Sequence, residues 1–298
     1  MKSATLKAAI SAALACAVIL SAAPKPALAD SPKDIWEKTL SKISTVKDYQ
    51  CVLHVFIWDT PTAIKHNPKN EEGKDNREYW YTYKLDMKWK KPGYNMFTVL
   101  AADNPGTDIA TKTIKRAPGS QVVFGFKDNK NLYSKFPKSG DPVMDKQTAK
   151  NIFFMPAIAF EGARQIGFNH NIHTMQSYIE RYFKSGRVVA DTAPLAAKKN
   201  FRFDPAKKNL DFDDEKLPGQ FIRLTMTPAD PNKNLGVTRE VMYINPSTML
   251  PAQIETYEGD RIVMCMYLEN FRANIGLENA LWEDFFKNTQ IFNPSGGK

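Results

Sequence analysis

The sequence predicts an α+β fold that is mainly β, with one large curved antiparallel sheet, an N-terminal helix and a central helical insertion as a lid. Apolar residues make up 43% and aromatic residues 11% of the 298-residue chain, which favours strands around a sizeable core. Most of the chain has a hydrophobic period of two, and turn residues separate its short apolar runs. A helical period is confined to the start and the middle of the chain.

Residues 1–29 have the three parts of a secretory signal peptide. A basic start precedes an apolar run, and a small-x-small cleavage site ends at Ala29. The apolar run is about 16 residues long, shorter than the roughly 20 that a spanning helix needs. We therefore expect cleavage after Ala29, export to the periplasm and a single mature domain of residues 30–298. An uncleaved membrane anchor and lipidation at Cys16 are the alternatives.

Two elements open the mature chain. Residues 31–46 predict an amphipathic helix, because Ser31 is a good N-cap, Pro32 suits a first turn and the apolar residues fall on one stripe. Residues 49–59 are almost continuously apolar and predict a strand that is covered on both faces. The polar stretch 61–76 predicts a loop.

Residues 78–91 form the clearest strand pattern in the sequence. The odd-numbered residues from Tyr79 to Trp89 are aromatic or apolar, and most of the even-numbered ones are polar. Six alternating apolar positions correspond to a strand face about 34 Å long. A strand of that length favours a large curved sheet or a barrel.

Shorter strands follow on both sides of the middle of the chain. They are predicted at 94–101, 109–115, 121–126, 132–136, 220–227, 239–245, 252–258 and 261–270. Between the two groups, 141–160 is apolar without alternation and 171–186 has helical spacing, and together they predict the helical insertion. Plain core packing is the alternative to a lid. Residues 188–218 are rich in lysine and aspartate and have no clear period.

Two cysteines, Cys51 and Cys265, remain in the mature chain, and both lie in predicted strands. In an oxidising compartment they are candidates for a disulfide that closes most of the mature chain into a loop. Loop-closure entropy would make such a bond worth about 4–5 kcal/mol. Two buried, reduced thiols are the alternative that the sequence leaves open.

The charge of the chain bears on its partners. The formal net charge is +9, and removing the three signal-peptide lysines (Lys2, Lys7 and Lys25) leaves +6. This value is typical of a soluble, lysine-rich surface, and attraction to an anionic membrane surface is the alternative reading. Export and the lack of a basic recognition helix argue against nucleic acid as a partner.

The motifs of the common enzyme and metal sites are missing. The sequence has no nucleophile elbow and no phosphate-binding loop, so we expect no catalytic residue and no enzyme activity. His170 and His173 lack a carboxylate or cysteine at a metal-site offset, and 211–215 lacks the glycine of a calcium loop. We therefore expect no metal and no cofactor. His54 lies on an apolar strand and is expected to be a buried histidine with its hydrogen bonds satisfied.

The closing region of the chain carries a family resemblance. Its segments are Phe221–Pro228, Val241–Asn245, Leu250–Glu255, the Gly259-Asp260 hairpin and Tyr267–Leu277. Together with the Lys91-Pro92-Gly93 turn and a Phe285-Phe286 tail, this order resembles the periplasmic lipoprotein-carrier (LolA-like) superfamily, in particular its uncharacterised secreted branch. The resemblance implies a half-open barrel with helices across its open side and an apolar cavity between them. It also implies a lipid or an acylated protein as the partner, in outer-membrane lipid or lipoprotein transport.

We expect aromatic and methionine side chains to line this cavity, because methionine adapts to variable acyl chains. The candidates are Phe56, Trp58, Tyr81, Tyr83, Leu85, Met87, Trp89, Phe154, Met175, Met264 and Met266. The sequence thus predicts a non-catalytic protein that holds a lipid or acyl chain. The alternative is a structural or protein-interaction module, such as a sensor, with the same fold and a filled core.

Overall fold

The computed structural model describes residues 30–66, 79–91, 94–103, 121–126, 131–135, 151–156, 175–204, 206–287 and 290–292. The strands are β1 (Asp48–Asp59), β2 (Tyr79–Lys90), β3 (Tyr94–Asp103), β4 (Gln121–Phe126), β5 (Asn131–Lys135), β6 (Asn151–Pro156), β7 (Arg187–Ala193), β8 (Ala196–Asp204), β9 (Asn209–Lys216), β10 (Phe221–Thr227), β11 (Arg239–Asn245), β12 (Leu250–Glu258), β13 (Arg261–Ala273) and β14 (Gln290–Phe292). The helices are α2 (Pro32–Thr45), α3 (Pro61–His66), α7 (Met175–Ser185) and α8 (Ala280–Lys287), with a 3-10 turn, η5 (Asn232–Asn234). The α+β, mainly β class that the sequence predicted is confirmed.

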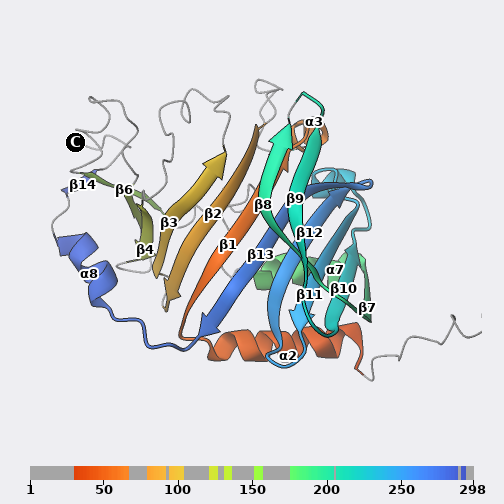
Figure 1. Cartoon of the computed structure of the whole chain (residues 1–298), viewed down its shortest axis with the longest axis horizontal. Helices are drawn as coiled ribbons and strands as arrows, with labels where there is room; N and C mark the ends of the chain where they lie inside the picture. Colours follow the sequence, from red (N-terminus) through yellow and green to blue (C-terminus); the bar gives the residue numbers. More distant parts are fainter. Residues whose placement is uncertain are drawn as a thin grey trace, which may run out of the picture.

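One 12-stranded sheet dominates the molecule, in the order β14-β6-β5-β4-β3-β2-β1-β13-β12-β11-β10-β7. Its neighbouring strands are antiparallel, apart from the parallel pair β14 and β6. At its centre β1 pairs with β13, so the two halves of the chain meet there (Figure 1). The strands β8 and β9 form a separate 2-stranded sheet, an antiparallel hairpin.

The two faces of the main sheet have different covers. Alternate residues of β1 point to opposite sides, as the doubly covered strand pattern predicted. Leu53 and Val55 belong to a core cluster that includes Trp36 of α2 and Ile179 of α7, and we call this side the helix-covered face. Phe56 belongs to a second cluster formed with β8, and we call that side the hairpin-covered face. In Figure 1 the β8–β9 hairpin lies in front of the sheet and α7 lies behind it.

Helix α2 begins and packs as its sequence predicts. The Ser31 hydroxyl accepts from the backbone N–H of Asp34 while the Asp34 carboxylate accepts from the backbone N–H of Ser31, which completes a capping box. The helix buries Ile35, Trp36, Thr39 and Ile43. It runs across the end of the sheet where β1 begins and β13 ends (Figure 1).

Several sequence predictions are corrected by the structure. The apolar stretch expected to be part of a helical insertion contains the strand β6, and α3 lies within the stretch 61–76 that was expected to be a loop. Residues 188–218, which had no clear period, form most of β7 and all of β8 and β9. The expected helix at 171–186 is confirmed as α7 from Met175 onward. The expected strand at 109–115 and most of the stretch 141–160 lie outside the described residues, and Phe285-Phe286 belongs to α8.

Candidate functional site

The expected cavity residues divide between the two faces of the sheet. Tyr83, Leu85, Met87, Trp89 and Met266 are buried in the core cluster of the helix-covered face, and Met264 packs against that cluster.

Phe56 and Trp58 lie on the hairpin-covered face, on the opposite side of the sheet from the other described candidates. The strand register gives the reason. Val55 is paired with Tyr83, which puts its neighbours on β1 on the far side of the sheet from Tyr83. The side chains of Tyr81, Phe154 and Met175 lie outside the described part of the structure.

The register of the helix-covered face lines up its apolar side chains in a continuous row. Adjacent members are paired across neighbouring strands from β7 to β2. The row consists of Ala190, Leu224, Met242, Ile254, Met266, Val55 and Tyr83. All of these residues belong to, or pack against, one core cluster, which also holds Met87 and Met226. The face is therefore apolar, rich in methionine and closed off from the hairpin side.

A next row on the same face is interrupted by polar groups. In it Met226 is paired with Glu240, Glu240 with Thr256, and Thr256 with Met264. The Glu240 carboxylate is fully buried and accepts a hydrogen bond from the hydroxyl of Tyr182 on α7. Burial and the nearby Glu240 charge raise the pKa of Tyr182, which keeps its hydroxyl a donor. This contact ties α7 to the sheet.

The two cysteines are free and buried. Cys51 lies in the cluster of the helix-covered face and Cys265 in that of the hairpin-covered face. Cys265 is paired with Phe56, which lies further along β1 than Cys51. The two side chains lie on opposite faces of the sheet and cannot form a disulfide without backbone movement. The structure therefore has two reduced thiols, the alternative that the sequence left open. Burial raises the pKa of both thiols.

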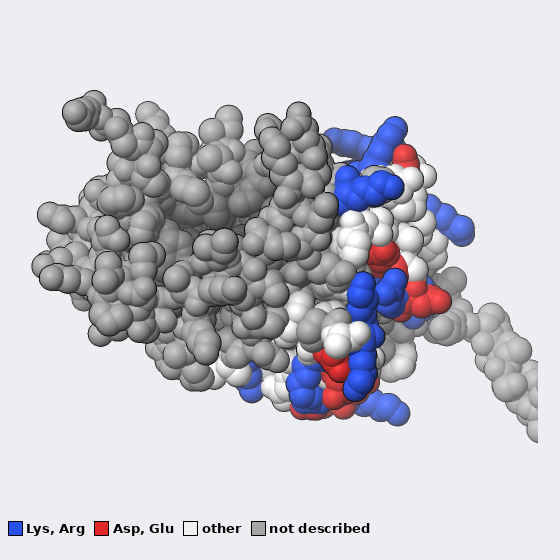
Figure 2. Space-filling model, turned by 90° about the horizontal axis from the view of Figure 1, so that it is seen from above, with Lys and Arg blue, Asp and Glu red and all other residues white. Residues whose placement is uncertain are grey.

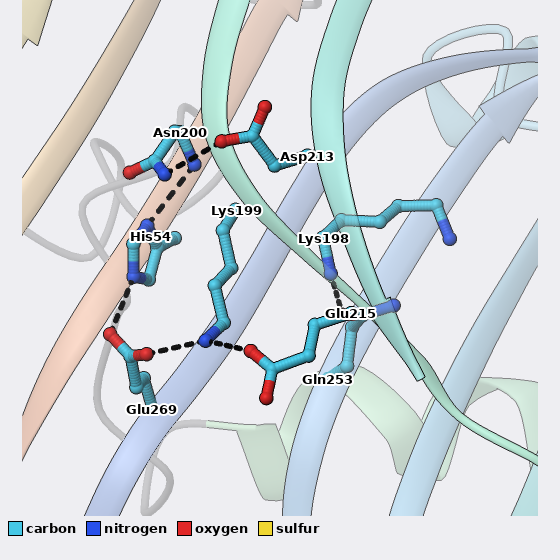
Figure 3. Close-up of polar contacts among 8 residues, drawn as sticks. All are labelled: His54, Lys198, Lys199, Asn200, Asp213, Glu215, Gln253 and Glu269. Atoms are coloured by element: carbon cyan, nitrogen blue, oxygen red, sulfur yellow. Dashed lines mark hydrogen bonds and ion pairs between the residues drawn. The ribbon is translucent and has the colours of Figure 1, made fainter. Parts of the chain in front are cut away.

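A polar network joins the β8–β9 hairpin to the main sheet (Figure 3). His54, which is 1% exposed, places Nε2 3.0 Å from Oε2 of Glu269, and its Nδ1 lies 3.3 Å from the backbone N of Asn200 on β8. Because a backbone N–H only donates, Nδ1 is the acceptor and Nε2 carries the proton that is donated to Glu269. This pattern fits a neutral ring, and burial lowers the pKa of His54 despite the contact with Glu269. The expectation of a buried, satisfied histidine is confirmed.

Lys199 is the central cation of this network (Figure 3). Its Nζ lies 2.5 Å from Oε1 of Glu269 on β13 and also contacts Glu215 on β9. Burial lowers the pKa of Lys199, but its hydrogen bonds with the two carboxylates outweigh this effect and raise the pKa overall. Likewise, burial raises the pKa of Glu269, but its bonds with His54 and Lys199 outweigh this effect and lower it. Lys199 of β8 is therefore charged and binds one carboxylate on β9 and one on β13. These ion pairs hold both hairpin strands to β13.

A second anchor lies beside the first one, at Lys198 on β8. The backbone N–H of Lys198 donates to Gln253 at 2.9 Å, and its Nζ donates to Glu255 at 2.7 Å. Gln253 returns a bond to the carbonyl of Ala196 at 3.2 Å. The Glu255 carboxylate, 2% exposed, also accepts from Gln253 and from the Tyr257 hydroxyl. Buried charges are tolerated when they are paired and fully hydrogen-bonded in this way.

Aromatic packing completes the contact between hairpin and sheet. The Phe203 ring of β8 lies 5.1 to 5.2 Å from the rings of Phe56, Trp58 and Trp80. The network and this cluster together make the hairpin a fixed layer of the fold. The described contacts of the His54 imidazole are with Glu269, the backbone of Asn200 and the ring of Tyr267.

Sequence reasoning missed most of this network. It found His54, because a histidine within an apolar strand has to be buried, but not Glu269, Lys199 or Lys198. Their partners lie far away in the chain, and the hairpin has short, charged strands that give no usable period. The spacing of Phe201 and Phe203, with a charged residue between them, was the one available signal that a face of β8 is buried.

The described residues contain no group of three or more His, Cys, Asp or Glu side chains that could hold a metal ion. No helix in the described ranges is long and apolar enough to cross a membrane. Seen from above, the described surface carries Lys and Arg side chains with Asp and Glu among them (Figure 2). On that view the two signs are mixed rather than separated.

No protein-family model and no curated protein matches the chain. Solved structures do resemble it. An uncharacterised conserved protein from Thermus thermophilus has 9% identity and a TM-score of 0.40, with 88% of this chain and 98% of that chain covered. A DUF1329 family protein from Desulfovibrio piger has 11% identity and a TM-score of 0.31, covering 85% and 97%. A LolA superfamily protein from Nitrosomonas europaea has 11% identity and a TM-score of 0.28, covering 86% and 100%.

Proposed function

We propose that the chain is a non-catalytic binding protein that holds a lipid or acyl chain against the helix-covered face of its sheet. The proposal places this activity in the periplasm, after removal of the expected signal peptide, where the protein serves lipid or lipoprotein transport. One observation carries it, the continuous apolar row with Met242 and Met266 that crosses the sheet from β7 to β2. Flexible thioether side chains re-pack around a guest more readily than branched ones.

The energetics of burial fit an acyl ligand. Each buried methylene contributes about 0.8 kcal/mol, so a long chain gains enough from an apolar face to bind without a charged contact. Helices α2 and α7 cover this face and bury their apolar side chains against it. Helix α2 contacts β12 and β7, and α7 contacts β7. Movement of α2 or α7 would open the face while the paired strands stay in place.

The tryptophans allow the occupied face to be identified directly. Trp36 and Trp89 lie on the helix-covered face, whereas Trp58 and Trp80 lie on the hairpin-covered face. A brominated fatty acid quenches tryptophan fluorescence on contact, so it reports which pair it touches. We expect quenching to persist in the Trp58→Phe/Trp80→Phe variant and to fall sharply in the matched Trp36→Phe/Trp89→Phe variant. Quenching that follows the other pair, or none at all, would overturn the proposal.

A second function is favoured by a different observation. Tyr83, Leu85, Met87 and Trp89 are at most 9% exposed and pack within one cluster, as in a filled core. A filled core suits a structural or protein-interaction module. In that case the wild-type protein would bind no acyl chain, and a partner protein would co-purify with it.

A further inference from the structure

Helix α2 buries two hydrogen-bonding side chains that have no partner in the described structure. The indole Nε1 of Trp36 and the hydroxyl of Thr39 are buried, with 2% and 0% of each residue exposed. Elsewhere on this helix Ser44 and Thr45 donate to the carbonyls of Ser41 and Lys42, so a local partner is the ordinary outcome. A buried donor without a partner is costly and calls for an explanation.

The two groups lie together at one end of the apolar face. Residues three apart in a helix lie on the same side of it, about 5–6 Å apart at their Cβ atoms. Trp36 belongs to the core cluster of the helix-covered face, and Thr39 is buried on the same side of α2. The core cluster of that face therefore has two polar groups beside it, on the helix that crosses one end of the sheet (Figure 1).

The chemistry of this pair selects its ligand. An indole N–H donates and never accepts, so the partner of Trp36 has to be an acceptor. The three lysines of α2, Lys33, Lys38 and Lys42, are exposed, and Arg181, which reaches this face from α7, is paired with Glu240. A carboxylate buried here would lack a counter-charge, and such burial is strongly unfavourable. An uncharged carbonyl oxygen has no such penalty.

We propose that Trp36 and Thr39 bind the carbonyl oxygen of an ester- or amide-linked acyl chain whose methylenes lie along the apolar row. This inference rests on the proposed function. It makes α2 the element that selects esterified lipids or acylated proteins over free fatty acids. The two donors replace the hydrogen bonds that the carbonyl gives up when it leaves water.

The test compares a fluorescent acyl probe as its methyl ester and as its free acid, since the two share one apolar part. We expect the wild-type protein to bind the ester more tightly. Thr39→Val keeps the side-chain shape, and we expect it to weaken ester binding about two- to tenfold, the effect of one neutral hydrogen bond, with acid binding unchanged. Trp36→Phe should lower the ratio of ester affinity to acid affinity. The smaller ring affects the packing of both probes alike, so this general effect cancels in the ratio.

Thr256→Val is the matched control. Thr256 is also buried without a partner on this face, but it lies beside Glu240 and away from α2. Removing its hydroxyl should leave the ester-to-acid ratio at the wild-type value. If Thr39→Val raises the thermal stability as Thr256→Val does and leaves the ratio unchanged, the pair is only a structural feature and the inference is overturned. If the wild-type protein binds neither probe, the proposed function itself fails, and this inference fails with it.

Discussion

At the residue scale, His54 has one hydrogen-bonding pattern available to it. Its Nδ1 accepts from the backbone of Asn200 and its Nε2 donates to Glu269. Protonation would place a second donor against the N–H of Asn200. The charged groups that face the ring, besides Glu269, are Lys84 of β2 and Lys199 of β8, and both cations oppose its protonation.

The first prediction concerns pH. The pKa of His54 is lowered in the folded state, so the unfolded chain binds the proton more readily. The stability that the neutral ring contributes is fully present above the unfolded pKa of about 6.5 and is lost as the pH falls through the folded pKa. We expect the free energy of unfolding to drop between pH 7.5 and 5, and to drop less in His54→Gln. Equal losses in both proteins, measured by urea unfolding, would contradict the assignment.

The second prediction concerns the clamp between Lys199 and Glu269. Their side chains are 16% and 21% exposed, so water screens the pair poorly. A double-mutant cycle with Lys199→Met and Glu269→Gln should give a coupling energy of about 1–3 kcal/mol. The exposed pair Lys33–Glu37, at 3.8 Å, is the control and should couple far more weakly. Equal coupling energies in the two cycles would mean that the Lys199–Glu269 ion pair stabilises the attachment of the hairpin no more than an exposed pair would.

At the element scale, aromatic contacts as well as ion pairs hold the β8–β9 hairpin against the main sheet. Phe203 contacts three aromatic rings of the main sheet, whereas Phe212 of β9 contacts Phe201 within the hairpin. This difference separates docking of the hairpin from its own integrity.

The third prediction uses that difference. Phe203→Ala should cost about 3–5 kcal/mol locally, because it removes a buried ring and leaves a cavity. Hydrogen exchange should then speed up along both hairpin strands while β1 and β13 stay protected. Phe212→Ala should change exchange less, since the contacts with the sheet remain. Uniform acceleration over the whole sheet in Phe203→Ala would show that the hairpin is not a separate unit of stability.

The fourth prediction concerns the joint between α7 and β7. A Cβ at Gly186 would lie 2.5 Å from the carbonyl oxygen of Thr227, which is backbone and cannot move aside. Gly186→Ala should therefore destabilise the protein by about 1–3 kcal/mol through overpacking. Ser185→Ala, at the neighbouring exposed position, should be close to neutral in thermal unfolding. A Gly186→Ala variant as stable as the wild-type protein would mean that the backbone at Gly186 moves easily away from Thr227 of β10.

At the scale of the whole molecule, the two strands at the centre of the sheet, β1 and β13, come from opposite ends of the chain. β1 pairs on one side with β2 and on the other with β13, through Leu53, Leu85 and Leu268. The helix-covered face therefore exists only after the last long strand has been added. Everything proposed for that face depends on this pairing.

Predictability from sequence followed the period of the local pattern. Alternation along β2 and the continuous apolar run of β1 gave both strands, because burial on one or both faces leaves a trace in single residues. The hairpin was missed because charged side chains such as Lys199 and Arg202 conceal the alternation of Phe201 and Phe203. The division of the candidate site was missed because the face on which Phe56 lies is set by the pairing with β2, which is a property of two strands together.

The proposed function requires the folded protein to carry an acyl chain. The most direct measurement is native mass spectrometry of the mature protein, from Asp30 onward, purified from periplasm without detergent, with organic extraction of what is bound. We expect a near-stoichiometric mass increment that extraction identifies as an ester- or amide-linked acyl species. A bare protein that also takes up no added fluorescent fatty acid or methyl ester would contradict it.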